Sequence, residues 1–227
     1  DFYNRNNNFH WKSSSKLNKV YKISFGNKSE IVSANSSNLI ISNNFAFYVD
    51  SKSNFIKFDL NKKINIFEIQ LIEGIDSKLS LPISLIKNNN FFYIGFGNGI
   101  VIKIDHKGKY YWKKYFNDLL RTPLRIVNDN IILIFNSNKI ISLNLNNGNI
   151  AWELNYDLDK PSLSKGGQIL VSHNLIFFVM PNGRIGVIDN IVGEPVEYLF
   201  LRSFLQKNIM YYNYEAKLNI YKNLLSL

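Results

Sequence analysis

Three aspartates stand at matching positions in this sequence and are its first candidates for chemistry. Asp59, Asp105 and Asp189 each end a short apolar run and precede a polar turn. Carboxylates that a fold brings together can transfer protons or hold a cation. A carboxylate at the end of a strand can instead accept hydrogen bonds from backbone N–H groups of the next turn. Because the three residues recur with similar neighbours, we assign them to turn geometry rather than to a catalytic set.

Histidine and glycine give weaker signals of a site. His10, His106 and His173 are isolated, without the His-Glu-x-x-His spacing or the clustered carboxylates of a metal site. The glycine-rich stretch 95–99 lacks the lysine of a phosphate-binding loop and lies between two strand-like runs, which favours a hairpin. Cysteine is absent, so neither a disulfide nor a thiolate metal site can form. The sequence therefore predicts no catalytic residue, no metal and no cofactor.

Composition indicates a globular, β-rich protein with a marked positive charge. Of its 227 residues, 46% are hydrophobic and 15% aromatic, and its net charge is +10. Such a charge suits nucleic acid or an anionic membrane. Lysines such as Lys52, Lys62, Lys87, Lys107 and Lys139 are nevertheless spread over turns and strand ends, and we expect no nucleic-acid binding. A peripheral binder of anionic surfaces remains a third hypothesis, which requires the lysines to converge on one face.

The positions of the aspartates reflect a repeated unit. Apolar runs separated by Asn-rich turns recur at 45–59, 91–105, 131–144 and 175–189. The Asp or Asn residues that end these copies lie 46, 39 and 45 residues apart. This is the length of a four-stranded propeller blade, and it is unlike a leucine-rich repeat. We predict an all-β propeller of four-stranded antiparallel blades, with about four to five blades.

Turn residues divide each unit into four strands. In the third unit they predict strands at 122–127, 131–135, 139–145 and 150–155, separated by Asn and Gly residues that accept a positive φ. The expected organisation is an N-terminal extension over 1–18 and a single propeller domain over 19–227. Within this domain we expect four blades and a partial fifth. The blades lie at about 31–72, 79–117, 120–157 and 165–201, and the partial blade at 203–227. A strand at 20–25 is expected to pair with a terminal blade.

Two of the units resemble the pyrroloquinoline-quinone-type propeller repeat. In this repeat an apolar strand is followed by a Leu-Asp pair, a Gly turn, and a Trp three or four residues later. The second unit has Gly108 and Trp112 at these places, and the third has Gly148 and Trp152. The resemblance implies a propeller, in which the two tryptophans pack between neighbouring blades.

The first and fourth units depart from this pattern. The first unit has Lys63 where Gly is usual and Phe67 where Trp is usual. The fourth keeps Asp189 and Gly193 but places Tyr198 in the aromatic region. The repeat therefore indicates a superfamily and not a function.

The order of segments is similar to the outer-membrane protein assembly factor BamB family, especially its alphaproteobacterial type. The similarity rests on Asn44–Leu60, Tyr93–Gly97 and Leu120–Arg125 and weakens after residue 155. Members are periplasmic lipoproteins with eight-bladed propellers, which scaffold β-barrel insertion by binding periplasmic domains of the central barrel subunit. The resemblance thus implies a non-catalytic, periplasmic scaffold at the outer membrane with that subunit as partner. The chain is too short for eight blades and lacks the lipidated Cys, so we expect a processed, truncated or reduced version.

Leu119, Leu120 and Arg121 are the candidate partner-binding residues. They precede the third unit at a place comparable to the family's partner-binding loop, which carries a Leu/Arg pattern. Arginine among aliphatic residues is typical of interface hot spots. An ordinary loop with a solvated arginine is the alternative interpretation.

A second function from another class remains open. A quinoprotein-like enzyme or a small-ligand-binding propeller would need a central pocket with convergent polar groups. Quinone-dependent dehydrogenases of this superfamily characteristically use a vicinal cysteine pair, which this sequence lacks. We therefore expect a binding protein and not an enzyme.

Overall fold

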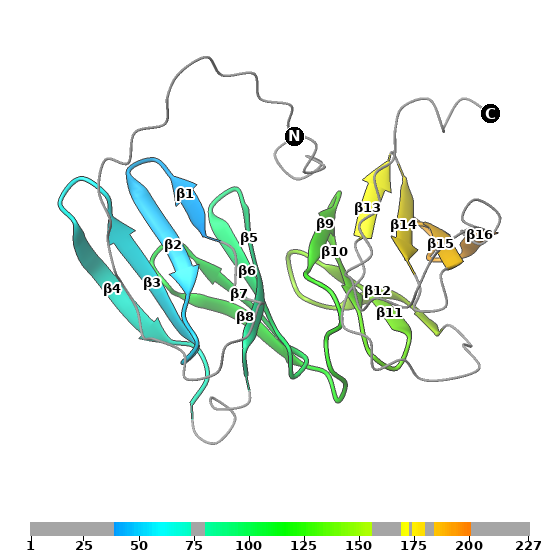
Figure 1. The fold of residues 1–227 in the computed structure, drawn as a ribbon, viewed down its shortest axis with the longest axis horizontal. Helices are drawn as coiled ribbons and strands as arrows, with labels where there is room; N and C mark the ends of the chain where they lie inside the picture. The colour runs from blue at the N-terminus through cyan, green and yellow to red at the C-terminus, as the bar shows by residue number, and fades with distance from the viewer. Residues whose placement is uncertain (1–38, 74–79, 156–168, 173, 180–183, 201–227) are drawn as a thin grey trace, which may run out of the picture.

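The computed structural model describes residues 39–73, 80–155, 169–172, 174–179 and 184–200 (Figure 1). These residues form four sheets of four antiparallel strands, without a helix among them. In every sheet the strands lie side by side in chain order. The prediction of an all-β protein with four-stranded blades is confirmed. The predicted extension, the strand at 20–25 and the partial blade at 203–227 lie outside the described residues.

The four sheets are named blades 1 to 4 in chain order. Blade 1 contains β1 (Ile40–Ser42), β2 (Phe45–Val49), β3 (Asn54–Asp59) and β4 (Ile64–Gln70). Blade 2 contains β5 (Pro82–Asn88), β6 (Phe91–Phe96), β7 (Ile100–Asp105) and β8 (Tyr110–Tyr115). Blade 3 contains β9 (Arg125–Val127), β10 (Asn130–Ile134), β11 (Lys139–Asn144) and β12 (Ile150–Asn155). Blade 4 contains β13 (Ile169–Ser172), β14 (Leu175–Val179), β15 (Arg184–Asp189) and β16 (Pro195–Phe200).

The first strand of blade 3 is shorter than predicted. The sequence predicts a strand at 122–127, whereas β9 pairs with β10 only from Arg125 to Val127. Pro123 has no backbone N–H to donate to a neighbouring strand, which explains the late start. The prediction that Asn and Gly supply the positive φ of the turns is confirmed in blade 3, whereas Ser53 and Lys63 take this conformation in blade 1. The residues with positive φ are Asn43, Asn89 and Asn128 before the second strand of a blade, Ser53, Gly99 and Asn138 before the third strand, and Lys63, Gly108, Gly148 and Gly193 before the fourth strand.

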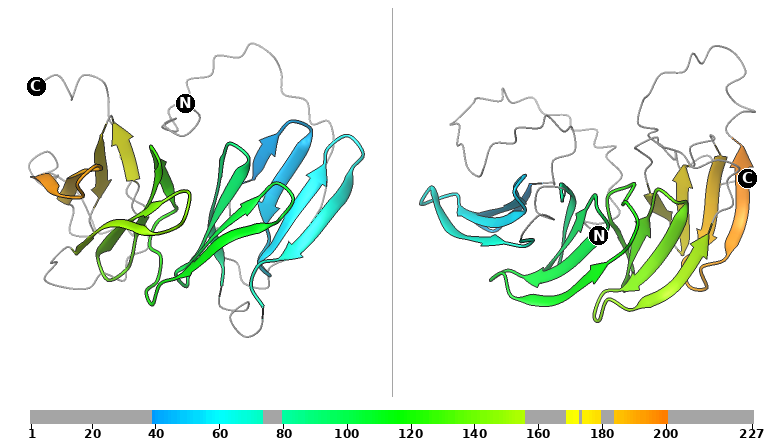
Figure 2. Two further views of the ribbon diagram at one scale, coloured as in Figure 1. Left: turned by 180° about the vertical axis from the view of Figure 1, so that it is seen from behind. Right: turned by 90° about the horizontal axis from the view of Figure 1, so that it is seen from below.

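Three of the four hydrophobic clusters among the described residues lie between blades, and the fourth is made by residues of blade 4 alone. Residues of blades 1 and 2, such as Phe55 and Ile94, form one cluster. Blades 2 and 3 share a second cluster around Leu133, and blades 3 and 4 share a third around Ile176. Successive side chains of a strand point to opposite faces, so each inner strand can contribute to two interfaces. The blades consequently stack face to face and follow one another along an arc (Figure 2).

The described part of the chain contains no helix that is long and apolar enough to cross a membrane.

Candidate partner-binding site

The loop between β8 and β9 carries the candidate partner-binding residues and joins blade 2 to blade 3. Leu120 forms an isolated antiparallel bridge with Phe135, beyond the end of β10. The backbone N–H of Arg121 donates to the carbonyl of Ile134 at 2.8 Å. The carbonyl of Leu119 accepts from the turn after β10 at 2.9 Å. These bonds fix the backbone of the loop against blade 3.

The three candidate residues differ in how far their side chains are exposed to solvent. The side chain of Leu119 is 54% exposed, whereas that of Leu120 is only 6% exposed. The bridge to Phe135 turns Leu120 into the cluster between blades 2 and 3. The grouping of all three as partner-facing therefore needs correction, because Leu120 belongs to the core and only Leu119 and Arg121 reach the surface.

Arg121 is half-buried and incompletely satisfied. Its Nη1 lies 3.4 Å from Oδ1 of Asn138, a long hydrogen bond. Its Nε is buried and has no hydrogen-bond partner among the described residues. Burial lowers the pKa of the guanidinium from its ordinary value, and the group still carries its charge at neutral pH. The site therefore presents a fixed, partly desolvated cation.

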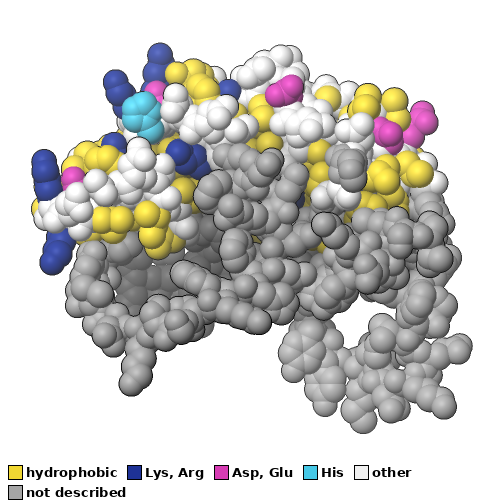
Figure 3. Space-filling model, turned by 90° about the horizontal axis from the view of Figure 1, so that it is seen from above, with side chains coloured by type: hydrophobic (Ala, Val, Ile, Leu, Met, Phe, Trp, Pro, Cys, Tyr) yellow, Lys and Arg dark blue, Asp and Glu magenta, His cyan; other side chains and the backbone are white. Residues whose placement is uncertain are grey.

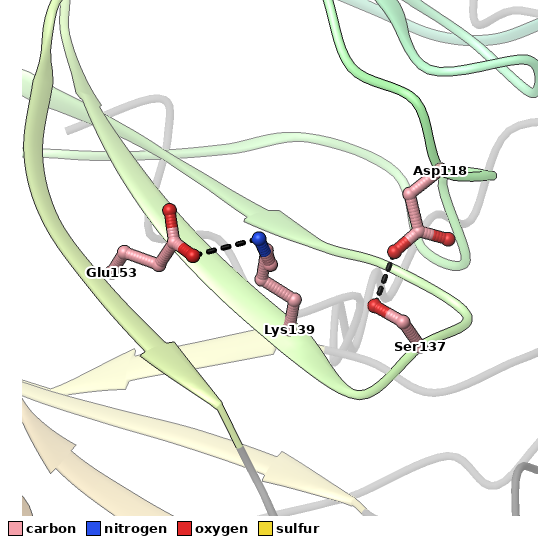
Figure 4. Close-up of polar contacts among 4 residues, drawn as sticks. All are labelled: Asp118, Ser137, Lys139 and Glu153. Carbon is pink, nitrogen blue, oxygen red and sulfur yellow. Dashed lines mark hydrogen bonds and ion pairs between the residues drawn. The ribbon is translucent and has the colours of Figure 1, made fainter.

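The polar side chains around the turn between β10 and β11, next to Arg121, bind one another. The hydroxyl of Ser137 donates to a carboxylate oxygen of Asp118, and Nζ of Lys139 lies 2.7 Å from Oε1 of Glu153 (Figure 4). Lys139–Glu153 is the ion pair found among the described residues, and it joins the neighbouring strands β11 and β12. Arg121 thus has no carboxylate partner within the part of the chain that the structure describes.

The two tryptophans occupy one repeated position between blades. Trp112 pairs with Lys103 across the β7–β8 ladder, and its indole N–H donates to the carbonyl of Leu145 in blade 3 at 3.2 Å. The indole of Trp152 donates to the carbonyl of Asn190 in blade 4 at 2.8 Å. Each indole thus reaches the turn between the third and fourth strands of the following blade.

The glycines of those turns leave room for the aromatic rings. A Cβ atom at Gly148 would lie 2.9 Å from Cδ2 of Trp112, and one at Gly193 would lie 2.5 Å from Trp152. The register of blade 4 places Glu197 at the corresponding position, opposite Val187, while Tyr198 pairs with Gly186. The aromatic of the fourth unit is therefore one residue away from the tryptophan position.

Lys103 is a buried cation that sequence reasoning did not single out. It is 3% exposed, and its Nζ donates to the carbonyl of Leu145 at 2.9 Å. Nζ also lies 4.2 Å from the ring centre of Phe91, a cation–π distance. Burial lowers its pKa. Its position inside the apolar run Ile100–Asp105 is a signal that could have identified it.

The three repeated aspartates accept hydrogen bonds from their own turns. Oδ1 of Asp59 accepts the backbone N–H groups of residues 61 and 62, and Oδ1 of Asp105 accepts those of residues 107 and 109. Oδ1 of Asp189 accepts those of residues 191 and 192. Asn144 fills the same role in blade 3. Each of the three carboxylates therefore stabilises the backbone of the turn that follows it.

Of the remaining sequence candidates, the structure describes His106 and the glycine-rich stretch 95–99. His106 lies exposed in the turn after β7, while His10 and His173 fall outside the described residues. Among the described residues no three His, Asp or Glu side chains gather where a metal ion could be held. The glycine-rich stretch 95–99 forms the hairpin between β6 and β7, in which Gly99 has a φ of 87°.

Comparison with known proteins links this architecture to two solved propellers. The structure of BamB from Moraxella catarrhalis superposes with a TM-score of 0.59 at 18% identity, over 76% of this chain and 51% of that one. Quinohemoprotein alcohol dehydrogenase from Comamonas testosteroni gives a TM-score of 0.58 at 12% identity, over 73% of this chain and 34% of that one. No family model matches the sequence, and no curated protein does.

These likenesses establish the fold. The chain has the propeller architecture shared by BamB and a pyrroloquinoline-quinone-type quinoprotein, as the repeat pattern predicts. It spans about half the length of the BamB structure and about a third of the dehydrogenase. At such low identity, function must be argued from the residues of the site.

Proposed function

We propose that this chain is a non-catalytic scaffold that binds a protein partner through the loop between β8 and β9. Arg121 carries the argument, because it holds a half-buried charge without a carboxylate partner among the described residues. A carboxylate on a partner would pair with the part of the guanidinium that reaches the surface, and exposed Leu119 would fill an adjacent apolar pocket. The backbone bonds of the loop reduce the entropy lost on binding.

The resemblance to BamB suggests what that partner is. A BamB-like scaffold assists the insertion of β-barrel proteins into the outer membrane by binding the periplasmic domains of the central barrel subunit. The choice of partner class rests on the order of segments shared with that family, and the propeller fold of BamB from Moraxella catarrhalis is compatible with it. We accordingly place the protein in the periplasm, associated with the outer membrane.

Affinity capture of those periplasmic domains, from the same organism, tests the proposal. Wild type should retain the domains, and Arg121→Glu should weaken binding at least tenfold, because a hot-spot arginine is typically worth 2 kcal/mol or more and the new charge repels a carboxylate (about 1.4 kcal/mol corresponds to tenfold). Lys52→Glu is the matched control, since Lys52 is an exposed lysine in the turn between β2 and β3. Failure of the folded wild type to bind, or equal loss in both variants, would count against the scaffold.

The quinoprotein neighbour supports one alternative function. Its TM-score of 0.58 is close to that of BamB, so the fold alone favours neither class. A quinone-binding propeller should show a rise in melting temperature with pyrroloquinoline quinone and Ca²⁺. Such a rise, together with no capture of the periplasmic domains, would favour the ligand-binding alternative.

A further inference from the structure

Exposed apolar side chains concentrate at one end of the blades. We call this end the hairpin rim and define it as residues 60–66, 106–111, 145–151 and 190–196, which include the turns between the third and fourth strands. Eight of the twelve large hydrophobic side chains that are exposed among the described residues lie there. They are Ile64, Ile66, Tyr110, Tyr111, Ile150, Ile191, Val192 and Val196.

The hairpin rim is continuous from blade to blade. A Cβ atom at Gly108 would meet the side chain of Ile69 in blade 1, just as Gly148 lies against Trp112 and Gly193 against Trp152. The turns of blades 2, 3 and 4 therefore sit on the outer strand of the preceding blade. The backbone of the turns is held by the side-chain oxygens of the preceding Asp or Asn, so the rim is a rigid row of tips.

Positive charge accompanies the apolar tips in blades 1 and 2. Lys62, Lys63, Lys107 and Lys109 are all exposed, and Glu194 is the one acidic residue within the four ranges of the rim. Seen from above, the described surface shows most of the dark blue lysine and arginine side chains in one half (Figure 3). Lys62 and Lys107 thus lie on equivalent turns of neighbouring blades, whereas Lys52 lies at the opposite end of blade 1.

We propose that the hairpin rim binds the surface of an anionic lipid bilayer. The Ile and Val side chains and Tyr111 would enter the interfacial region, while the lysines pair with lipid phosphates. The hydroxyl of Tyr110 instead donates to the carbonyl of Gln70 in blade 1. The apolar residues occur singly or in pairs along an arc and not as one central cluster, which fits a bilayer better than the pocketed hot spot of a protein interface. Aliphatic tips in blades 3 and 4 also offer no stacking platform for nucleic-acid bases. The proposal is independent of the scaffold function, whose loop lies at the opposite end of the blades.

Vesicle flotation of the full chain tests this proposal. Wild type should float with equimolar phosphatidylcholine and phosphatidylglycerol and remain in solution with phosphatidylcholine alone, and added salt should weaken the binding. Lys107→Glu should lower the partition coefficient about tenfold, because it reverses a charge at the lipid surface. Lys52→Glu, the same change at the opposite end of a blade, should have much less effect.

A second pair of variants tests the apolar contribution. Ile191→Asn removes a side chain that is 67% exposed on the rim, and Tyr115→Asn removes one that is 65% exposed at the far end of β8. We expect about a threefold to tenfold loss of vesicle binding for Ile191→Asn and no loss for Tyr115→Asn. Absence of wild-type binding to the anionic vesicles would overturn the proposal. Equal effects of rim and control variants, or binding of RNA with the same residue dependence in place of vesicles, would do so as well.

Discussion

A single backbone position in each blade shows how residue choice follows geometry. The residue that closes the turn before the fourth strand has a φ of 57° at Lys63, 83° at Gly108, 69° at Gly148 and 74° at Gly193. A left-handed conformation costs a residue with a side chain about 1–2 kcal/mol. At Gly148 a Cβ would also approach Cδ2 of Trp112 to 2.9 Å. Glycine is thus required there by conformation and by the neighbouring blade together.

Exchanging the residues at two of these positions should have opposite effects on stability. Gly148→Lys should lower the free energy of unfolding by about 2–4 kcal/mol, because backbone strain adds to overpacking against Trp112. Lys63→Gly should raise it by no more than about 1 kcal/mol, since relief of strain is partly offset by the greater entropy of glycine in the unfolded chain. Urea unfolding measures both changes. A similar loss in both variants would contradict this account of the turn.

At the scale of elements, the fourth strand of one blade is tied to the turn of the next by an indole hydrogen bond. The two indole hydrogen bonds differ in how many other donors reach the same carbonyl. The carbonyl of Leu145 accepts from Trp112, from Nζ of Lys103 at 2.9 Å and from the hydroxyl of Tyr93 at 3.4 Å. The carbonyl of Asn190 accepts a hydrogen bond from the indole N–H of Trp152 at 2.8 Å. Among the described side chains, this indole is its donor.

Replacing each tryptophan by phenylalanine should therefore cost different amounts. Trp152→Phe keeps an aromatic ring but leaves the Asn190 carbonyl without its donor, and we expect a loss of about 1–2 kcal/mol. Trp112→Phe should lose less than about 1 kcal/mol beyond the packing change common to both variants, because two other donors remain at Leu145. Thermal unfolding under identical conditions compares them. A larger loss for Trp112→Phe would show that packing outweighs the hydrogen bond.

The sequence predicts features that depend on residues close together in the chain, and it misses features that depend on distant ones. Strand alternation and the Asn or Gly of the turns depend on neighbouring residues, and the four-stranded blades were predicted from them. The burial of Leu120 depends on its bridge to Phe135, and the burial of Lys103 depends on a carbonyl 42 residues away. The late start of β9 reflects Pro123, whose missing donor was visible in the sequence. Contacts between blades were therefore the part that local pattern could not supply.

For the whole molecule, the location of the core between blades determines how stability is shared. Ile94 lies in the cluster between blades 1 and 2, and Ile176 lies in the cluster between blades 3 and 4. Both side chains are fully buried. A stack in which each unit contacts only its neighbours gains stability from each interface separately. Damage to one interface should consequently be felt most by the two blades that share it.

Ile94→Val and Ile176→Val test this expectation with the same chemical change at two interfaces. Each should cost about 0.5–1.5 kcal/mol, too little to unfold a typical domain. Amide hydrogen exchange followed by peptide mass analysis should rise in blades 1 and 2 for Ile94→Val and in blades 3 and 4 for Ile176→Val. A uniform rise over all four blades in both variants would mean that the arc opens as one cooperative unit. In that case the interfaces would be coupled through the sheets, and a partner bound at the loop between blades 2 and 3 would stabilise the distant blades as much as its own.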